Sequence, residues 1–159
     1  MAELAWQDLA SALTADRRHK PRATGVTMVI DTGMGAAGLR DVLELAGPYI
    51  DHWKFAFGTS VLHGPPLLRR KLAMLAEHGI LAYPGGTLLE VALVERHCRE
   101  YMRLAKTEGF TAVEISDGVI PMPAFRRRNI IRCALDAGLT PITEAGKKDP
   151  RQQPSADSL

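Results

Sequence analysis

The stretch ILAYPGGTLLE, residues 80–90, combines a short apolar run, a turn and the start of a helix. A strand is expected at 80–83, because the run is short, apolar and followed by Pro84 and two glycines. Thr87 is a candidate N-cap for the helix, and the glycines allow backbone N–H groups to face outward. A strand that leads directly into a helix N-terminus is a favourable place for an anion.

The same pattern recurs along the chain at intervals of about 30 residues, the length of one strand–helix unit with short loops. Each expected helix ends at a glycine that precedes an apolar strand: Gly47, Gly79, Gly109 and Gly138. Glycine just past a helix end adopts the left-handed conformation at little cost. Gly47 fits least well, because further residues separate it from the next strand. The repeat predicts an α/β fold with a parallel sheet.

Five strands and four helices are expected between residues 23 and 150. The strands are expected at 24–31, 50–55, 80–83, 111–115 and 140–144, and the helices near 39–46, 66–78, 88–108 and 124–137. Spacings of three and four in the third helix predict a buried face made of Val91, Val94, Cys98, Tyr101 and Ala105.

Two terminal segments lie outside this repeat. Residues 1–22 are expected to form a leader helix and a linker, with Trp6, Leu9 and Leu13 at helical spacing. Residues 151–159 form a polar tail that resembles the start of a further unit. The expected division is therefore 1–22, 23–150 and 151–159.

Composition narrows the possible functions. The chain has 159 residues, of which 46% are apolar and 24% charged, with a net charge of +2. So small a charge argues against nucleic acid as a partner, and the basic clusters at 17–20, 69–71 and 126–128 are interpreted as solvated faces or loops. Cys98 and Cys133 fall on expected helices, which favours a reducing cytoplasm over a disulfide framework. No apolar run is long enough to span a membrane, so no membrane association is expected.

Polar residues gather where the expected strands end, the edge at which parallel α/β folds bind ligands. They are Asp31, Lys54, Gly85, Gly86, Thr87, Glu114, Ser116, Asp117, Glu144, Lys147 and Lys148. Charges such as Lys54 and Glu114 inside apolar strands are costly unless they are paired or functional. Either the acids and lysines form structural ion pairs, or the carboxylates bind a divalent metal and the lysines an anionic substrate. Oxygen ligands of this kind suit magnesium.

A competing motif is the segment 33–38, GMGAAG, which matches the dinucleotide fingerprint after a strand and before a helix. Two observations count against it. Asp31 would repel a pyrophosphate, and the second strand ends in Lys54 where an acid would be needed for the ribose. A flexible glycine loop over an active site is the favoured interpretation.

Four blocks resemble the phosphosulfolactate synthase family: KFAFGTS at 54–60, YPGGTLLE at 83–90, EISDG at 114–118 and EAGKKDP at 144–150. The resemblance is collinear from about residue 21 to residue 150. It implies a (β/α)8 TIM barrel, of which this chain would supply an incomplete arc of about five parallel strands in chain order with four outer helices.

The resemblance also implies an activity, the magnesium-dependent addition of sulfite to phosphoenolpyruvate, which gives phosphosulfolactate for coenzyme M biosynthesis. By the resemblance Lys148, or its neighbour Lys147, donates a proton. The expected metal ligands are Asp31, Glu114 and Glu144, and the expected anion-binding residues are Lys54, Gly85, Gly86, Thr87 and Ser116. The alternative is a non-catalytic relative with a binding or stress-protection role.

An arc of five strands has unpaired edges at its first and fifth strands. It also leaves apolar residues of the inner face, such as Val29, without the opposite side of the barrel to pack against. Each large apolar side chain that stays exposed to solvent loses about 1.5–3 kcal/mol of stabilisation from burial. We therefore expect the 159 residues alone to aggregate, to form a homo-oligomer by dimerising across the open edges, or to depend on a missing segment supplied separately, and not to be a competent enzyme.

Overall fold

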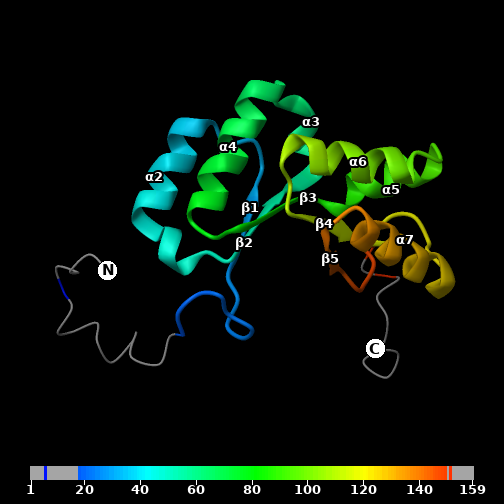
Figure 1. Cartoon of the computed structure of the whole chain (residues 1–159). Helices are drawn as coiled ribbons and strands as arrows, with labels where there is room; N and C mark the ends of the chain where they lie inside the picture. Colours follow the sequence, from blue (N-terminus) through cyan, green and yellow to red (C-terminus); the bar gives the residue numbers. More distant parts are fainter. Residues whose placement is uncertain (1–5, 7–17, 150, 152–159) are drawn as a thin grey trace.

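The computed structural model describes residue 6, residues 18–149 and residue 151 (Figure 1), so most of the predicted leader and polar tail lies outside the described residues. The strands are β1 (Met28–Asp31), β2 (His52–Phe55), β3 (Leu81–Pro84), β4 (Ala112–Ile115) and β5 (Thr140–Thr143). The α-helices are α2 (Ala36–Ala46), α3 (Thr59–Leu62), α4 (Pro65–Glu77), α5 (Gly86–Val94), α6 (Cys98–Glu108) and α7 (Ala124–Asp136). The short 3-10 helices are η1 (Gly47–Tyr49) and η2 (Ala56–Gly58).

The strands pair in parallel and in chain order, as predicted, but in two groups and not in one continuous arc. One sheet has the order β1-β2-β3 and the other pairs β4 with β5. Where β3 and β4 meet, Thr111 N–H donates to Ala82 O at 3.3 Å, while Ala82 N–H donates to Thr111 Oγ1 at 3.2 Å. The threonine hydroxyl thus replaces a backbone acceptor, and Pro84 at the other end of β3 has no N–H to donate. The observed fold is mixed α/β with parallel strands.

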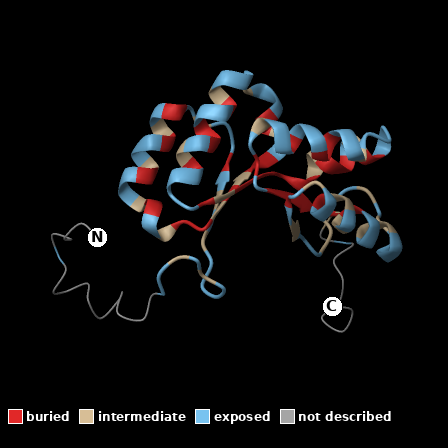
Figure 2. Cartoon of the chain, viewed as in Figure 1, coloured by how far each residue is buried: buried red, intermediate tan, exposed pale blue. Residues whose placement is uncertain are grey.

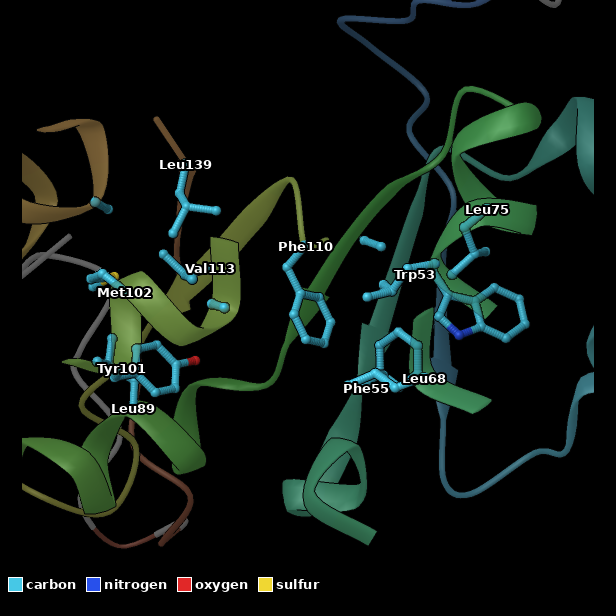
Figure 3. Close-up of a cluster of buried hydrophobic side chains, with 14 of the residues drawn as sticks. Trp53, Phe55, Leu68, Leu75, Leu89, Tyr101, Met102, Phe110, Val113 and Leu139 are labelled. Carbon is cyan, nitrogen blue, oxygen red and sulfur yellow. The ribbon is translucent and has the colours of Figure 1, made fainter. Parts of the chain in front are cut away.

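The helices cover the sheets on one side and enclose a single core. Helices α2 and α4 lie against the β1-β2-β3 sheet, and α5, α6 and α7 lie around β4 and β5 (Figure 1). The helices turn their buried faces toward the strands (Figure 2). Phe110 lies between the Trp53 side and the Tyr101 side of the cluster in Figure 3, and its ring meets that of Phe55 edge-to-face at 5.5 Å between centroids. One hydrophobic core therefore joins both strand groups.

The prediction of one continuous helix at 88–108 is wrong. The structure has two helices there, α5 and α6, and Arg96 between them adopts a positive φ of 62°. Val91 and Val94, predicted to be buried, are 53% and 58% exposed. The break changes the helical register between α5 and α6. The spacing that identifies the buried face of α6 therefore selects exposed residues when it is continued into α5.

The side chains of β1 alternate between two faces, and the prediction that Val29 lies on the inner face, away from the helices, is wrong. Val29 packs against the core, whereas Met28 and Ile30 are 45% and 51% exposed. The parallel register aligns Met28 with His52 and Ile30 with Lys54. The inner face is therefore the one that carries Lys54, and Met28 and Ile30 are the apolar side chains exposed on it.

The glycine repeat and the cysteine positions can both be compared with the structure. Gly79, Gly109 and Gly138 have the positive φ values expected past a helix end, whereas Gly47 is right-handed with φ of −49° and starts η1. Both cysteines lie on helices and are free thiols. Of the helices described, none is long and apolar enough to cross a membrane.

Candidate functional site

The inner face brings Lys54 of β2 to Glu114 of β4. Lys54 Nζ lies 2.7 Å from Glu114 Oε1, and these side chains are only 14% and 5% exposed. Glu144 Oε1, just beyond β5, lies 3.7 Å from the same nitrogen, with its side chain 45% exposed. Two carboxylates predicted from strand ends thus converge on the Lys54 ammonium group. The pair formed with Glu114 is the strong one, since exposed ion pairs contribute little.

The N-terminus of α5 already binds a carboxylate of the chain itself. Gly86 N–H donates to Glu114 Oε2 at 2.6 Å, and Gly85 N–H donates to the Phe55 carbonyl at 2.8 Å. The prediction of Thr87 as the N-cap is wrong, because the helix begins at Gly86, two residues earlier than expected, and Gly85 occupies the cap position. The positive end of the helix therefore stabilises Glu114.

Lys147 and Lys148 point to different partners. Lys147 Nζ donates to Asp117 Oδ2 at 2.7 Å and to Asp117 O at 2.6 Å, and Arg127 donates to the other oxygen of this carboxylate. Lys148 Nζ instead donates to Thr87 Oγ1 at 2.5 Å, on the first turn of α5. Lys148 therefore lies at the same helix terminus as Glu114, whereas Lys147 is held in a salt bridge.

A buried acid that the sequence analysis did not single out is Glu90 on α5. Its carboxylate is 1% exposed and accepts hydrogen bonds from the loop after β4. The donors are Ser116 Oγ at 2.5 Å and the N–H groups of Gly118, Val119 and Ile120 at 3.2, 2.9 and 2.6 Å. Burial alone would raise the pKa of Glu90, but these hydrogen bonds and the nearby Lys148 lower it overall. Ser116, predicted to bind substrate, is thus engaged in holding this loop.

Asp31, predicted as a metal ligand, lies on the opposite face of the sheet from Lys54 and Glu114. Its Oδ2 is 2.6 Å from Lys71 Nζ and accepts from Trp53 Nε1 at 3.1 Å. Both members of the Asp31–Lys71 pair have fully buried side chains. Burial would raise the pKa of Asp31, but the hydrogen bond from Lys71, followed by others, brings it below its ordinary value.

The burial of Lys71 corrects the interpretation of cluster 69–71 as a solvated face. Lys71 lies on the side of α4 that packs against the core, and that side also buries Leu68, Leu72 and Leu75. Its ammonium group also donates to Met34 O at 2.6 Å and to His63 Nε2 at 3.0 Å. All three ammonium protons therefore have an acceptor, which a buried lysine requires.

The glycine-rich loop after β1 folds onto Asp31. Gly33 N–H and Met34 N–H donate to Asp31 Oδ1 at 2.8 and 2.7 Å. These amides are the ones that would face a pyrophosphate in a dinucleotide site. The strand order within β1-β2-β3 also has no reversal, the point where such a site would form. Neither observation favours the dinucleotide interpretation.

The described residues contain no group of three or more His, Cys, Asp or Glu side chains arranged to hold a metal ion. Of the three predicted ligands, Glu114 and Glu144 lie together at Lys54. Magnesium in substrate sites is commonly bound by one or two carboxylates together with waters and substrate phosphate, which this pair fits. Asp31 is occupied by four hydrogen bonds on the other face.

Tyr83 on β3 adds a phenol to the inner face. Its hydroxyl donates to Met28 Sδ at 3.0 Å. Burial, and then the negative charges of Glu114 and Glu144, raise the pKa of Tyr83 to about 12. It therefore stays a protonated donor next to the two acids.

A cavity of about 460 Å³ lies elsewhere, between α6 and α7. Its lining residues are Arg99, Met102, Arg103, Lys106, Thr107, Cys133, Asp136 and Ala137. None of the predicted site residues is among them, so this cavity does not mark the site at the strand ends.

Parallel strands in chain order, with lysines and carboxylates gathered at their carboxyl-terminal ends, are typical of α/β proteins that bind ligands at that edge. The family model for (2R)-phospho-3-sulfolactate synthase (ComA) matches residues 15–159. The chain belongs to this family.

Three relatives, each named phosphosulfolactate synthase, agree with this assignment. The chain is 39% identical to the protein from Methanothermobacter thermautotrophicus over 88% of its own length and 54% of the relative's. For the protein from Methanocaldococcus jannaschii the identity is 39%, over 79% and 50% of the two chains, and for that from Bacillus subtilis 35%, over 84% and 52%. The chain thus spans about half the length of these relatives.

Proposed function

We propose that the protein carrying this chain is a lyase that adds sulfite to phosphoenolpyruvate and forms phosphosulfolactate, a step of coenzyme M biosynthesis. The observation that carries the proposal is the meeting of Lys54, Glu114 and Lys148 at the N-terminus of α5, in a chain of this family. The two ammonium groups suit substrates that carry phosphate, carboxylate and sulfite charges.

In the proposed reaction the sulfur lone pair attacks C3 of the enol phosphate. The electrons of the double bond move toward the substrate carboxylate, and a proton then adds to C2. A magnesium ion bound by Glu114 and Glu144 would stabilise the carboxylate charge as a Lewis acid. Lys54, held on the inner face by Glu114, would orient the anionic substrate by charge.

Lys148 is the proposed proton donor. Its ammonium group is hydrogen bonded to the neutral hydroxyl of Thr87, whereas the ammonium of Lys147 is paired with the Asp117 carboxylate. Thr87 lies on the first turn of α5, so this contact holds Lys148 at the helix terminus that Glu114 also contacts, whereas the salt bridge holds Lys147 at Asp117. Lys148 is therefore better placed than Lys147 to act as a general acid.

The proposal is tested by following phosphoenolpyruvate with and without sulfite in the presence of magnesium, for a full-length form and for the 159-residue chain in parallel. We expect sulfite-dependent consumption by the full-length form and formation of a product that contains both phosphate and sulfonate. Consumption that does not depend on sulfite, or none at all, would exclude this activity.

We also propose that the 159-residue chain associates with itself. Met28 and Ile30 are half exposed on the inner face, and β1 is an edge strand of its sheet. Exposed apolar side chains next to an unpaired strand edge favour pairing with another chain. Size-exclusion chromatography with light scattering should find a dimer or larger species, and a stable monomer at all concentrations would contradict this.

A further inference from the structure

We propose that Glu90 is a positioning residue, whose buried carboxylate gathers the loop after β4 and through it fixes Lys148 at Thr87. This inference rests on the proposed function for its kinetic consequence, but its structural core stands on the hydrogen bonds of Glu90 itself. No role for Glu90 follows from the proposed chemistry, because its carboxylate is only 1% exposed and its oxygens are fully engaged.

The first step is the bond between helix and loop. Glu90 Oε1 accepts from Ser116 Oγ and Gly118 N–H, and Glu90 Oε2 accepts from Val119 N–H and Ile120 N–H. Consecutive backbone N–H groups that converge on one anion form a nest, which stabilises a negative charge without a cation in direct contact. A loop without regular structure thereby gains a fixed shape.

The second step is the bond between loop and lysine. Lys148 N–H donates to Gly118 O at 3.0 Å. The methylene chain of Lys148 packs on the α-carbon side of Gly118, where an added Cβ would lie 3.3 Å from Lys148 Cγ and Cε. Lys148 Nζ then reaches Thr87 Oγ1 at 2.5 Å.

Thr87 and Glu90 are one helical turn apart on α5, so the contacts form a closed circuit from helix to loop to lysine and back to the helix. The negative charge of Glu90 also attracts the Lys148 ammonium group. A proton donor that must reach C2 of a bound substrate needs this kind of fixed placement, since displacements of about 1 Å can cost about 100-fold in rate.

The test compares Glu90→Gln, which keeps the size but removes the charge and one acceptor oxygen, with Glu95→Gln, the exposed acid at the end of the same helix. Amide hydrogen exchange of residues 118–120 and acetylation of Lys148 by acetic anhydride are followed by mass spectrometry. In Glu90→Gln we expect both to become at least about tenfold faster, because hydrogen bonds to a charged acceptor are the strong ones. Exchange in β2 and all rates in Glu95→Gln should stay unchanged.

The kinetic arm uses the full-length form. Glu90→Gln should lower kcat for sulfite addition by about 100-fold while KM for phosphoenolpyruvate changes less than about threefold, because placement of the donor and not substrate binding is lost. If Glu90→Gln fails to fold, Ser116→Ala removes one donor of the four and should give smaller changes in the same direction.

Unchanged loop exchange or unchanged Lys148 acetylation in Glu90→Gln would overturn the inference. So would faster exchange combined with unaltered kcat. A parent protein without sulfite-dependent turnover would refute the proposed function alone, because the exchange and acetylation results would still decide whether Glu90 positions Lys148.

Discussion

Replacement of Lys71 by methionine should be among the most destabilising single changes in this chain. The methionine side chain is unbranched like that of lysine and only one heavy atom shorter, so the change removes the charge with little loss of volume. It leaves the buried carboxylate of Asp31 without its cation and also leaves Met34 O and His63 Nε2 without a donor. Breaking one side of a buried ion pair typically costs about 3–5 kcal/mol. Against a usual net stability of about 5–15 kcal/mol, that is a large fraction.

The assay is urea unfolding followed by tryptophan fluorescence, with Arg70→Met as the matched control on the exposed side of the same helix. We expect a loss of about 3–5 kcal/mol in Lys71→Met and less than about 0.5 kcal/mol in Arg70→Met. The double variant Asp31→Asn, Lys71→Met should recover part of the loss, because it no longer buries an unpaired charge.

The pH dependence supplies a second check on the same pair. Because the folded-state pKa of Asp31 is lowered, its contribution to stability is present above the unfolded pKa and is lost as pH falls through the folded pKa. Without Lys71 that lowering is reduced, so the difference between parent and Lys71→Met should shrink below about pH 4. A loss under about 1 kcal/mol at pH 7, or a difference that grows in acid, would refute the reasoning.

Three further predictions concern the core and the inner face. Gly86→Ala should destabilise the chain by about 1–3 kcal/mol in thermal melts, because the new Cβ would overlap the Ser116 hydroxyl and lie 2.8 Å from Ser116 Cβ; Gly64→Ala, with open space around the position, is the control. Phe110→Ala should lower the free energy of unfolding in urea by about 3–5 kcal/mol, since Phe110 is 5% exposed between the two strand groups. A loss as small as that of Leu135→Ala, at an exposed position, would show that Phe110 does not join the two groups in one core. Tyr83 should remain protonated until about pH 12, so the tyrosinate absorbance that Tyr83→Phe removes should appear only near that pH; its appearance near pH 10 would show that Tyr83 is not buried beside the acids.

The periodicity of apolar residues and the glycines at helix ends predicted most of the fold. The glycine repeat located β3, β4 and β5 to within a few residues, because a left-handed residue is needed where the helix before each of them turns back into the sheet. The break between α5 and α6 was not predictable in this way. Residues 95–97, Glu-Arg-His, contain neither glycine nor proline. Arg96 takes the left-handed position that ends α5, where glycine is the usual residue, and the N–H groups of Arg96 and His97 donate to Leu93 O and Ala92 O.

Part of the candidate site was readable from side-chain alternation. Lys54 and Glu114 were identified because a charge inside an apolar strand needs a partner, and the structure supplies one. The same alternation separates Asp31 from Lys54, since Asp31 shares a face with Val29, which packs against the core. Lys71 also had a signal, because it lies at helical spacing with buried leucines, but membership of a basic triplet suggested a solvated face.

Glu90 could not be assigned from the sequence. Three of its four partners are backbone N–H groups of a loop nearly 30 residues away, and no residue type or spacing identifies such donors. Contacts of this kind depend on how the loop after β4 returns over α5, a matter of tertiary packing.

The most direct test of the account is sulfite-dependent consumption of phosphoenolpyruvate by a full-length form and by its Lys148→Ala variant, with magnesium and substrate binding measured by calorimetry on both. We expect turnover in the parent, at least about a 100-fold lower kcat in Lys148→Ala, and binding that is nearly unchanged. Lys147→Ala, which removes the neighbouring lysine from its salt bridge with Asp117, should keep most of the turnover. Near-normal turnover in Lys148→Ala would contradict the proposed site and move the proton donor to Lys147 or to another residue.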